Sequence, residues 1–78
     1  MTKVDISKLI ASKTSGKVWI KRDKDDNIIT VRVYSPNGNG RGYCEINDDG
    51  VNIDRLVRAD YQVVKDYLTS INVNSYRA

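Results

Sequence analysis

Three segments of this chain alternate apolar and polar residues with a period of two, and this alternation constrains the fold most strongly. Residues 17–22, 28–35 and 43–47 each place apolar side chains at every second position. Successive side chains of a β-strand point to opposite faces, so each segment predicts a strand with one buried face. The polar segments 23–27 and 36–42 contain turn residues, so we expect the strands to form an antiparallel meander.

The apolar face of this predicted meander needs a covering element, and the second half of the chain supplies one. From Asn52 to Ile71, apolar residues recur at steps of three and four, which predicts the main helix. Both Asn52 and Asp60 can cap a helix, so residues 52–59 are either part of it, a separate turn or irregular, whereas 61–70 is its firmer part. The predicted core positions of the sheet are Val18, Ile20, Ile29, Val31, Val33, Cys44 and Ile46.

The two ends of the chain predict smaller elements. A short amphipathic helix is expected over residues 5–13, with Asp5 as its N-cap and Gly16 as its stop. Residues 73–76 either add an edge strand or fray. The 78 residues therefore predict a single small α+β domain, 1–78, in α-β-β-β-α order. It is a three-stranded antiparallel β-meander packed against a C-terminal α-helix, with a short N-terminal helix.

The outward face of the predicted meander combines aromatic and basic side chains. Such a combination suits stacking on bases, cation–π contacts or an interface hot spot. The first helix leaves two arrangements open: it shares the apolar face, or it folds over the aromatic face and makes a second small core there. The candidate residues for binding nucleic acid or another partner are Lys17, Trp19, Lys21, Arg32, Tyr34, Arg41 and Tyr43.

The charge is distributed unevenly along the chain. Residues 1–22 hold six cations and one acid, a net charge of +5, although the whole chain carries only +3. This basic pole would attract nucleic acid, an acidic protein surface or an anionic membrane, or it simply keeps the surface solvated.

The chain offers little for catalysis, metal binding or a cofactor. It has no histidine and one cysteine, Cys44, which is predicted to face the core, so we expect no enzyme, no metal site, no cofactor and no internal disulfide. Cys44 would need an exposed, electropositive site to act as a nucleophile. Glu45, on the outward face, is expected to pair with Arg32 or a lysine.

Three polar segments resemble ligand-binding loops but are predicted to be turns. Asp23, Asp25 and Asn27 match the start of a calcium-binding EF-hand loop, but the required glycine and glutamate are missing further on. Residues 38–42 are rich in glycine but precede a strand and lack the lysine of a phosphate-binding loop. Residues 48–50 are expected to form a turn before the main helix.

The composition also bears on location. A lone cysteine fits a reducing compartment, and the apolar run at 9–11 is too short for a signal peptide or a membrane span. We therefore expect an unprocessed cytoplasmic protein without a membrane partner.

The predicted order resembles that of several small domain classes. The α-β-β-β-α order is similar to that of double-stranded RNA-binding domains, whose second helix opens with a lysine-rich run, whereas residues 52–55 here are not basic. A three-stranded sheet followed by a helix is similar to the arm-binding domains of phage-type integrases, which lay the sheet in the DNA major groove. Small phage-encoded inhibitors of host defence, including anti-CRISPR proteins, show comparable sheets with one covering helix.

Two functional hypotheses follow. The favoured one is a non-enzymatic module that binds DNA or RNA through the basic and aromatic sheet face. The alternative is a small inhibitor of the phage or mobile-element type that binds a larger host protein complex, one that handles nucleic acid, through the same residues. A homodimer contact through the aromatic face or a strand edge is also left open.

Overall fold

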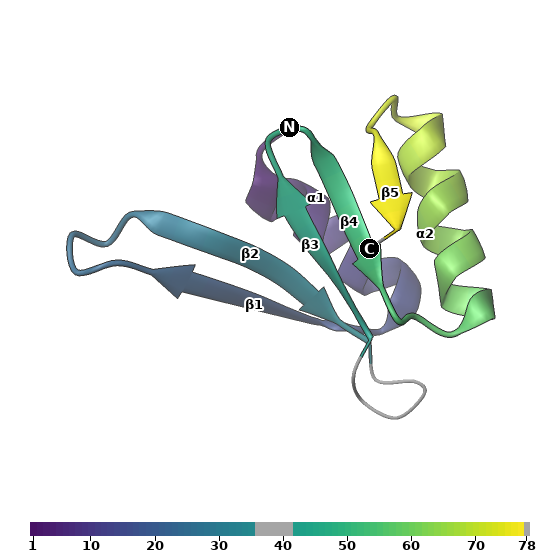
Figure 1. Ribbon diagram of the computed structural model, residues 1–78, viewed down its shortest axis with the longest axis horizontal. Coiled ribbons are helices and arrows are strands. Elements are labelled where there is room, and N and C mark those ends of the chain that lie inside the picture. Colours follow the sequence, from purple (N-terminus) through teal and green to yellow (C-terminus); the bar gives the residue numbers. More distant parts are fainter. Residues whose placement is uncertain (36–41, 78) are drawn as a thin grey trace.

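A five-stranded mixed sheet forms the centre of the computed structural model, which describes residues 1–35 and 42–77 (Figure 1). The strands lie in the order β1-β2-β3-β4-β5, antiparallel from β1 to β4, with β5 parallel to β4. Two helices accompany them. The elements are α1 (Lys3–Thr14), β1 (Lys17–Arg22), β2 (Ile28–Tyr34), β3 (Tyr43–Asn47), β4 (Gly50–Asp54), α2 (Arg58–Ser70) and β5 (Ser75–Arg77).

The predicted α+β class is confirmed, but the number and order of the strands differ. The order is α-β-β-β-β-α-β, not α-β-β-β-α, because residues 52–54 belong to β4 and not to a helix. Val51 and Ile53 point into the core while Asn52 and Asp54 point to the other face, and all four pair with β3. This pairing satisfies the backbone of the segment, so the helix begins only at Arg58.

The turn at residues 48–50 was expected to precede a helix, and it instead joins β3 to β4. Gly50 has a φ of 141°, and a Cβ atom there would lie 2.5 Å from the carbonyl oxygen of Asn74. Only glycine fits this close approach without a shift of backbone. The tight turn thus lets β4 fold back on β3 and lets residue 74 approach β4.

The C-terminal tail forms β5, so of the two predicted alternatives the edge strand is confirmed. The backbone N–H of Val51 donates to the carbonyl of Asn74 at 2.8 Å, just before β5 begins. Helix α2 connects β4 to β5 and buries Val64 and Leu68. Within residues 1–35 and 42–77, no helix is both long and apolar enough to cross a membrane.

Helix α1 begins three residues earlier than the predicted N-cap implies. Thr2, not Asp5, is the N-cap: its Oγ1 accepts from the backbone N–H of Asp5 at 3.1 Å, and the Asp5 carboxylate accepts from the Thr2 N–H at 3.0 Å. This reciprocal pair is a capping box. The hydrogen bonds from the backbone and side chain of Thr2 lower the pKa of Asp5.

Both helices cover the same face of the sheet. Ile6 and Ile10 of α1 join Val64 and Leu68 of α2 in one buried cluster with the inward-facing strand residues. Helix α1 therefore shares the apolar face, and of the two arrangements left open by the sequence this is the one observed. Among the described residues, no helix lies over the opposite face (Figure 1). That face carries the aromatic side chains of Trp19, Tyr34 and Tyr43.

The predicted sheet core is confirmed at its centre and wrong at one end. The residues Val31, Val33, Cys44 and Ile46 are buried, and Val18 and Ile20 are half-buried. Ile29, however, is 58% exposed. The reason is that β1 and β2 extend as a hairpin past the helices (Figure 1), and the register shifts beside Ile29, where Lys21 pairs with Thr30 and Arg22 with Ile28. We call this hairpin, residues 17–34, the arm.

Candidate binding site on the open face of the sheet

The open face is the side of the sheet that no helix covers, and cross-strand register places its side chains in rows. One row runs Trp19, Arg32, Glu45, Asn52 and Tyr76 from β1 to β5, each residue opposite the next. A second, neighbouring row runs from β1 to β4. Its members are Lys17, Tyr34, Tyr43 and Asp54.

The three predicted aromatic residues are in contact across β1, β2 and β3. The rings of Trp19 and Tyr34 lie 6.3 Å apart between centroids, at an interplanar angle of 82°. Tyr34 and Tyr43 lie 5.6 Å apart, at 46°. Edge-to-face and tilted pairs at such distances are favourable because ring edges are positive and ring faces negative. The aromatic residues therefore form a continuous cluster, with Trp19 at its outer end.

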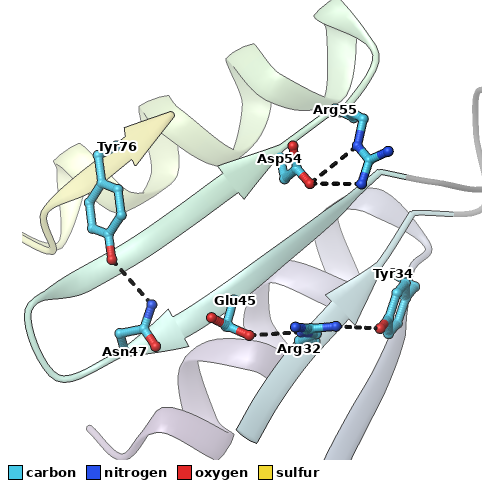
Figure 2. A network of polar contacts seen from close by, with 7 residues as sticks. All are labelled: Arg32, Tyr34, Glu45, Asn47, Asp54, Arg55 and Tyr76. Atoms are coloured by element: carbon cyan, nitrogen blue, oxygen red, sulfur yellow. Dashed lines mark hydrogen bonds and ion pairs between the residues drawn. The ribbon is translucent and has the colours of Figure 1, made fainter. Parts of the chain in front are cut away.

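Arg32 is at the centre of this cluster. Its Nε donates to Glu45 Oε1 at 2.8 Å, and its Nη1 donates to the hydroxyl of Tyr34 at 3.0 Å (Figure 2). The guanidinium carbon also lies 4.6 Å from the ring centroid of Tyr43 and 5.8 Å from that of Trp19, within cation–π range. The 2.8 Å contact confirms the ion pair expected from the sequence. The hydrogen bonds to Tyr34 and Glu45 raise the pKa of Arg32.

Two lysines on β1 are the uncommitted cations of the open face. Lys17 and Lys21 are exposed, and neither forms an ion pair with a residue in the described part of the chain. They lie two residues before and after Trp19, so all three side chains project from the same side of β1. Because β1 is the outermost strand, this positive charge lies along a free edge of the sheet.

The far end of the open face is polar and includes residues that sequence reasoning missed. The Nδ2 group of Asn47 donates to the hydroxyl of Tyr76 at 3.2 Å, and Asp54 pairs with Arg55 at 3.1 Å (Figure 2). Asn52 Oδ1 is buried and has no hydrogen-bond partner among residues 1–35 and 42–77. The alternation of Gly50–Asp54 is the sequence signal for Asn52 and Asp54, but residues 52–59 also fit the start of the main helix, a separate turn or an irregular segment. The face therefore changes from basic at β1 to polar at β4, where the charge of Asp54 is balanced by Arg55.

The predicted binding residues can now be placed. Six of them, Lys17, Trp19, Lys21, Arg32, Tyr34 and Tyr43, lie together on the open face. The seventh, Arg41, lies outside the described residues, as does most of the glycine-rich segment 36–42.

Cys44 and the polar turn at residues 23–27 are not part of the aromatic cluster on the open face. Cys44 is 1% exposed, and burial, helped by the negative charge of Asp60, raises the pKa of its thiol to about 12. A thiol with this pKa carries almost no thiolate at neutral pH. The Asp23 carboxylate accepts from the backbone N–H groups of Asp25 and Asn27 at 2.9 and 3.0 Å, so it closes the turn of the arm. Among the described residues, no group of three or more acidic or cysteine side chains could hold a metal ion.

A shallow pocket, separate from the aromatic cluster, lies beside α2 and the start of β5. Its volume is about 400 Å³, and it is lined mainly by polar residues between Lys65 and Ser75. It shares no residue with the open-face cluster.

Comparison of the chain with protein-family models, with curated proteins and with solved structures found no match.

Proposed function

We propose that this chain is a non-enzymatic binding module that binds nucleic acid on the open face of its sheet. The observation that carries the proposal is the arrangement on β1, where Trp19, 42% exposed, lies between Lys17 and Lys21. Neither lysine forms an ion pair with any residue that the structure describes. At the rise of an extended strand, the two lysine Cα atoms lie about 13 Å apart, with Trp19 midway. An aromatic platform with cations on both sides supplies base stacking and phosphate contact together.

Arg32 has a different role in this proposal from the two lysines. Its charge is already balanced by Glu45, and its Nε and Nη1 donate to Glu45 and Tyr34. We therefore assign Lys17 and Lys21 to phosphate contact and Arg32 to positioning the rings of Trp19 and Tyr43. A rigid aromatic surface loses less conformational entropy on binding than a mobile one.

The proposal is tested by fluorescence anisotropy with labelled DNA and RNA oligonucleotides over a range of salt concentrations. Trp19→Ala should weaken binding by about 1–3 kcal/mol if a base stacks on the indole. Lys21→Ala should reduce the slope of log affinity against log salt by about one, whereas Lys8→Ala, an exposed lysine on α1, should leave that slope nearly unchanged. If the folded protein binds none of the oligonucleotides at low salt, the proposal is wrong.

A protein partner is the second candidate, and the balanced charge of Arg32 favours it. Tryptophan, tyrosine and arginine are the residues enriched in interface hot spots, and here they form one preorganised cluster. Such an interface loses little affinity as salt rises, because its energy comes from buried aromatic surface. A stoichiometric complex that survives nuclease treatment and high salt would support this candidate over the first.

A further inference from the structure

The indole of Trp19 is 42% exposed, and its ring and cation–π contacts come from side chains of β2. Arg32, directly opposite on β2, places its guanidinium carbon 5.8 Å from the indole centroid, and Tyr34 approaches in an edge-to-face arrangement. No strand lies beyond β1 among the described residues. The exposed part of the ring therefore lies on the side away from Arg32.

We infer that this site takes single-stranded nucleic acid, with one unpaired base stacked on the outer side of Trp19; this inference rests on the proposed function. In a duplex both sides of each internal base are covered by its neighbours. A base can stack on Trp19 only after leaving that stack, which costs a few kcal/mol in a duplex and much less in a single strand. The flanking Lys17 and Lys21 then contact the backbone on each side of that base.

The tip of the arm provides a second, independent argument against duplex. A two-stranded β-ribbon is the right size for the major groove, and the arm is such a ribbon, extending beyond the helices (Figure 1). Its tip, residues 23–27, holds three aspartates and one lysine, a net charge of −2. The neighbouring Arg22 forms an ion pair with Asp26, at 3.8 Å between Nε and Oδ1, and its Nη1 donates to the carbonyl of Asp26 at 3.0 Å. With Arg22 included, residues 22–27 still carry a net charge of −1. Insertion of this tip between two phosphate backbones would be repulsive.

The exposure of Trp19 and the negative charge of the tip indicate different roles for two parts of the arm. The middle of β1 offers cationic and aromatic contacts to a nucleic-acid strand that lies along the edge of the sheet. The tip of the arm repels phosphates. A single strand can follow β1 without meeting the tip, whereas a duplex groove that receives the arm must enclose it. The inference therefore concerns both where the nucleic acid lies and which form of it binds.

The experiment compares a non-self-complementary oligonucleotide of about 12 nucleotides with its blunt duplex, both as DNA and as RNA, by anisotropy and by quenching of Trp19 fluorescence. The single strand should bind at least about tenfold more tightly than the duplex and quench Trp19. Trp19→Ala should remove most of this preference, and Trp19→Phe, which keeps an aromatic ring, should retain it. The fold of each variant is checked by circular dichroism.

A matched variant tests the role of the tip. Asp25→Asn combined with Asp26→Asn keeps side chains that suit this turn, including the positive φ of 66° at position 26, while removing two negative charges. Its affinity for duplex should rise by a larger factor than its affinity for the single strand. Duplex binding as tight as single-strand binding, with quenching of Trp19, would overturn the inference and leave the proposed function intact. Absence of binding to either form would overturn both.

Discussion

At the scale of single residues, Arg32 holds the side chains of the open face together. One guanidinium contacts Glu45, Tyr34, Tyr43 and Trp19, so four side chains from three strands are held in one arrangement. Its charge is offset within the same cluster, and the net attraction for an anion is left to the β1 lysines. This separation of positioning from charge can be tested at Glu45.

Glu45→Gln should increase affinity for a single-stranded oligonucleotide. The glutamine still accepts a hydrogen bond from Arg32 but no longer offsets its charge, so the potential over the cluster becomes more positive. We expect a gain of roughly two- to fivefold at low salt, by analogy with the worth of partly exposed ion pairs. Asp66→Asn, a change of the same charge on the exposed surface of α2, serves as the control and should have a smaller effect. A loss of affinity in Glu45→Gln would contradict this account.

Asp23 is the residue at which pH should act on the arm. Hydrogen bonds from Asn27, and from the backbone of Asp25, lower the pKa of its carboxyl below the ordinary value of 3.8. A lowered folded-state pKa means that the stabilising contribution is present above the unfolded pKa and is lost as pH falls through the folded one. Titration of the carboxyl carbons by NMR should place Asp23 below 3.8. A value at or above it would show that these hydrogen bonds do not form in solution.

At the scale of elements, period-two alternation predicted β1, β2 and β3 nearly to the residue, because each is half-buried and bounded by turn residues. The same alternation continues in Gly50–Asp54, but Val51 and Ile53 also fit the start of an apolar stripe that continues into α2. A short apolar run does not distinguish a strand from the start of a helix. The tight turn at residues 48–50 places this segment beside β3, where it pairs as a strand. The uncovered part of the arm, with exposed Ile29, depends on where α1 packs, which local pattern does not contain.

Helix α2 offers a sharp test of the core on adjacent turns. Leu68 is fully buried in the cluster beneath the sheet, whereas Val63 is 43% exposed. Leu68→Ala should lower the free energy of unfolding by about 2–5 kcal/mol, because it removes buried methyl groups and leaves a cavity. Val63→Ala should change it by no more than about 0.5 kcal/mol. Urea denaturation of the two variants measures both, and equal losses would mean that α2 does not pack on the face described above.

At the scale of the whole molecule, the two faces of the sheet have separate tasks. The helices and the inward strand residues stabilise the fold, and the outward residues of the same strands form the candidate site. The aromatic members of that site could be predicted from the sequence because strand alternation assigns them to one face. Asn52 and Asp54 join that face only if Gly50–Asp54 is a strand, which the alternation there allows but does not require, and Tyr76 joins it only through the pairing of β5 with β4. The resulting change from a basic β1 to a polar β4 is a property of the assembled sheet.

The central claim is that the open face, and not the helical side, is the binding surface. The most direct measurement is an NMR titration of isotope-labelled protein with a single-stranded oligonucleotide. It follows the indole N–H of Trp19 on the open face and the methyl groups of Leu9 and Val63, which are exposed on the helices. The account predicts a saturable shift of the Trp19 resonance while the Leu9 and Val63 methyl groups stay in place. A silent Trp19, with or without shifts at Leu9 and Val63, would contradict it.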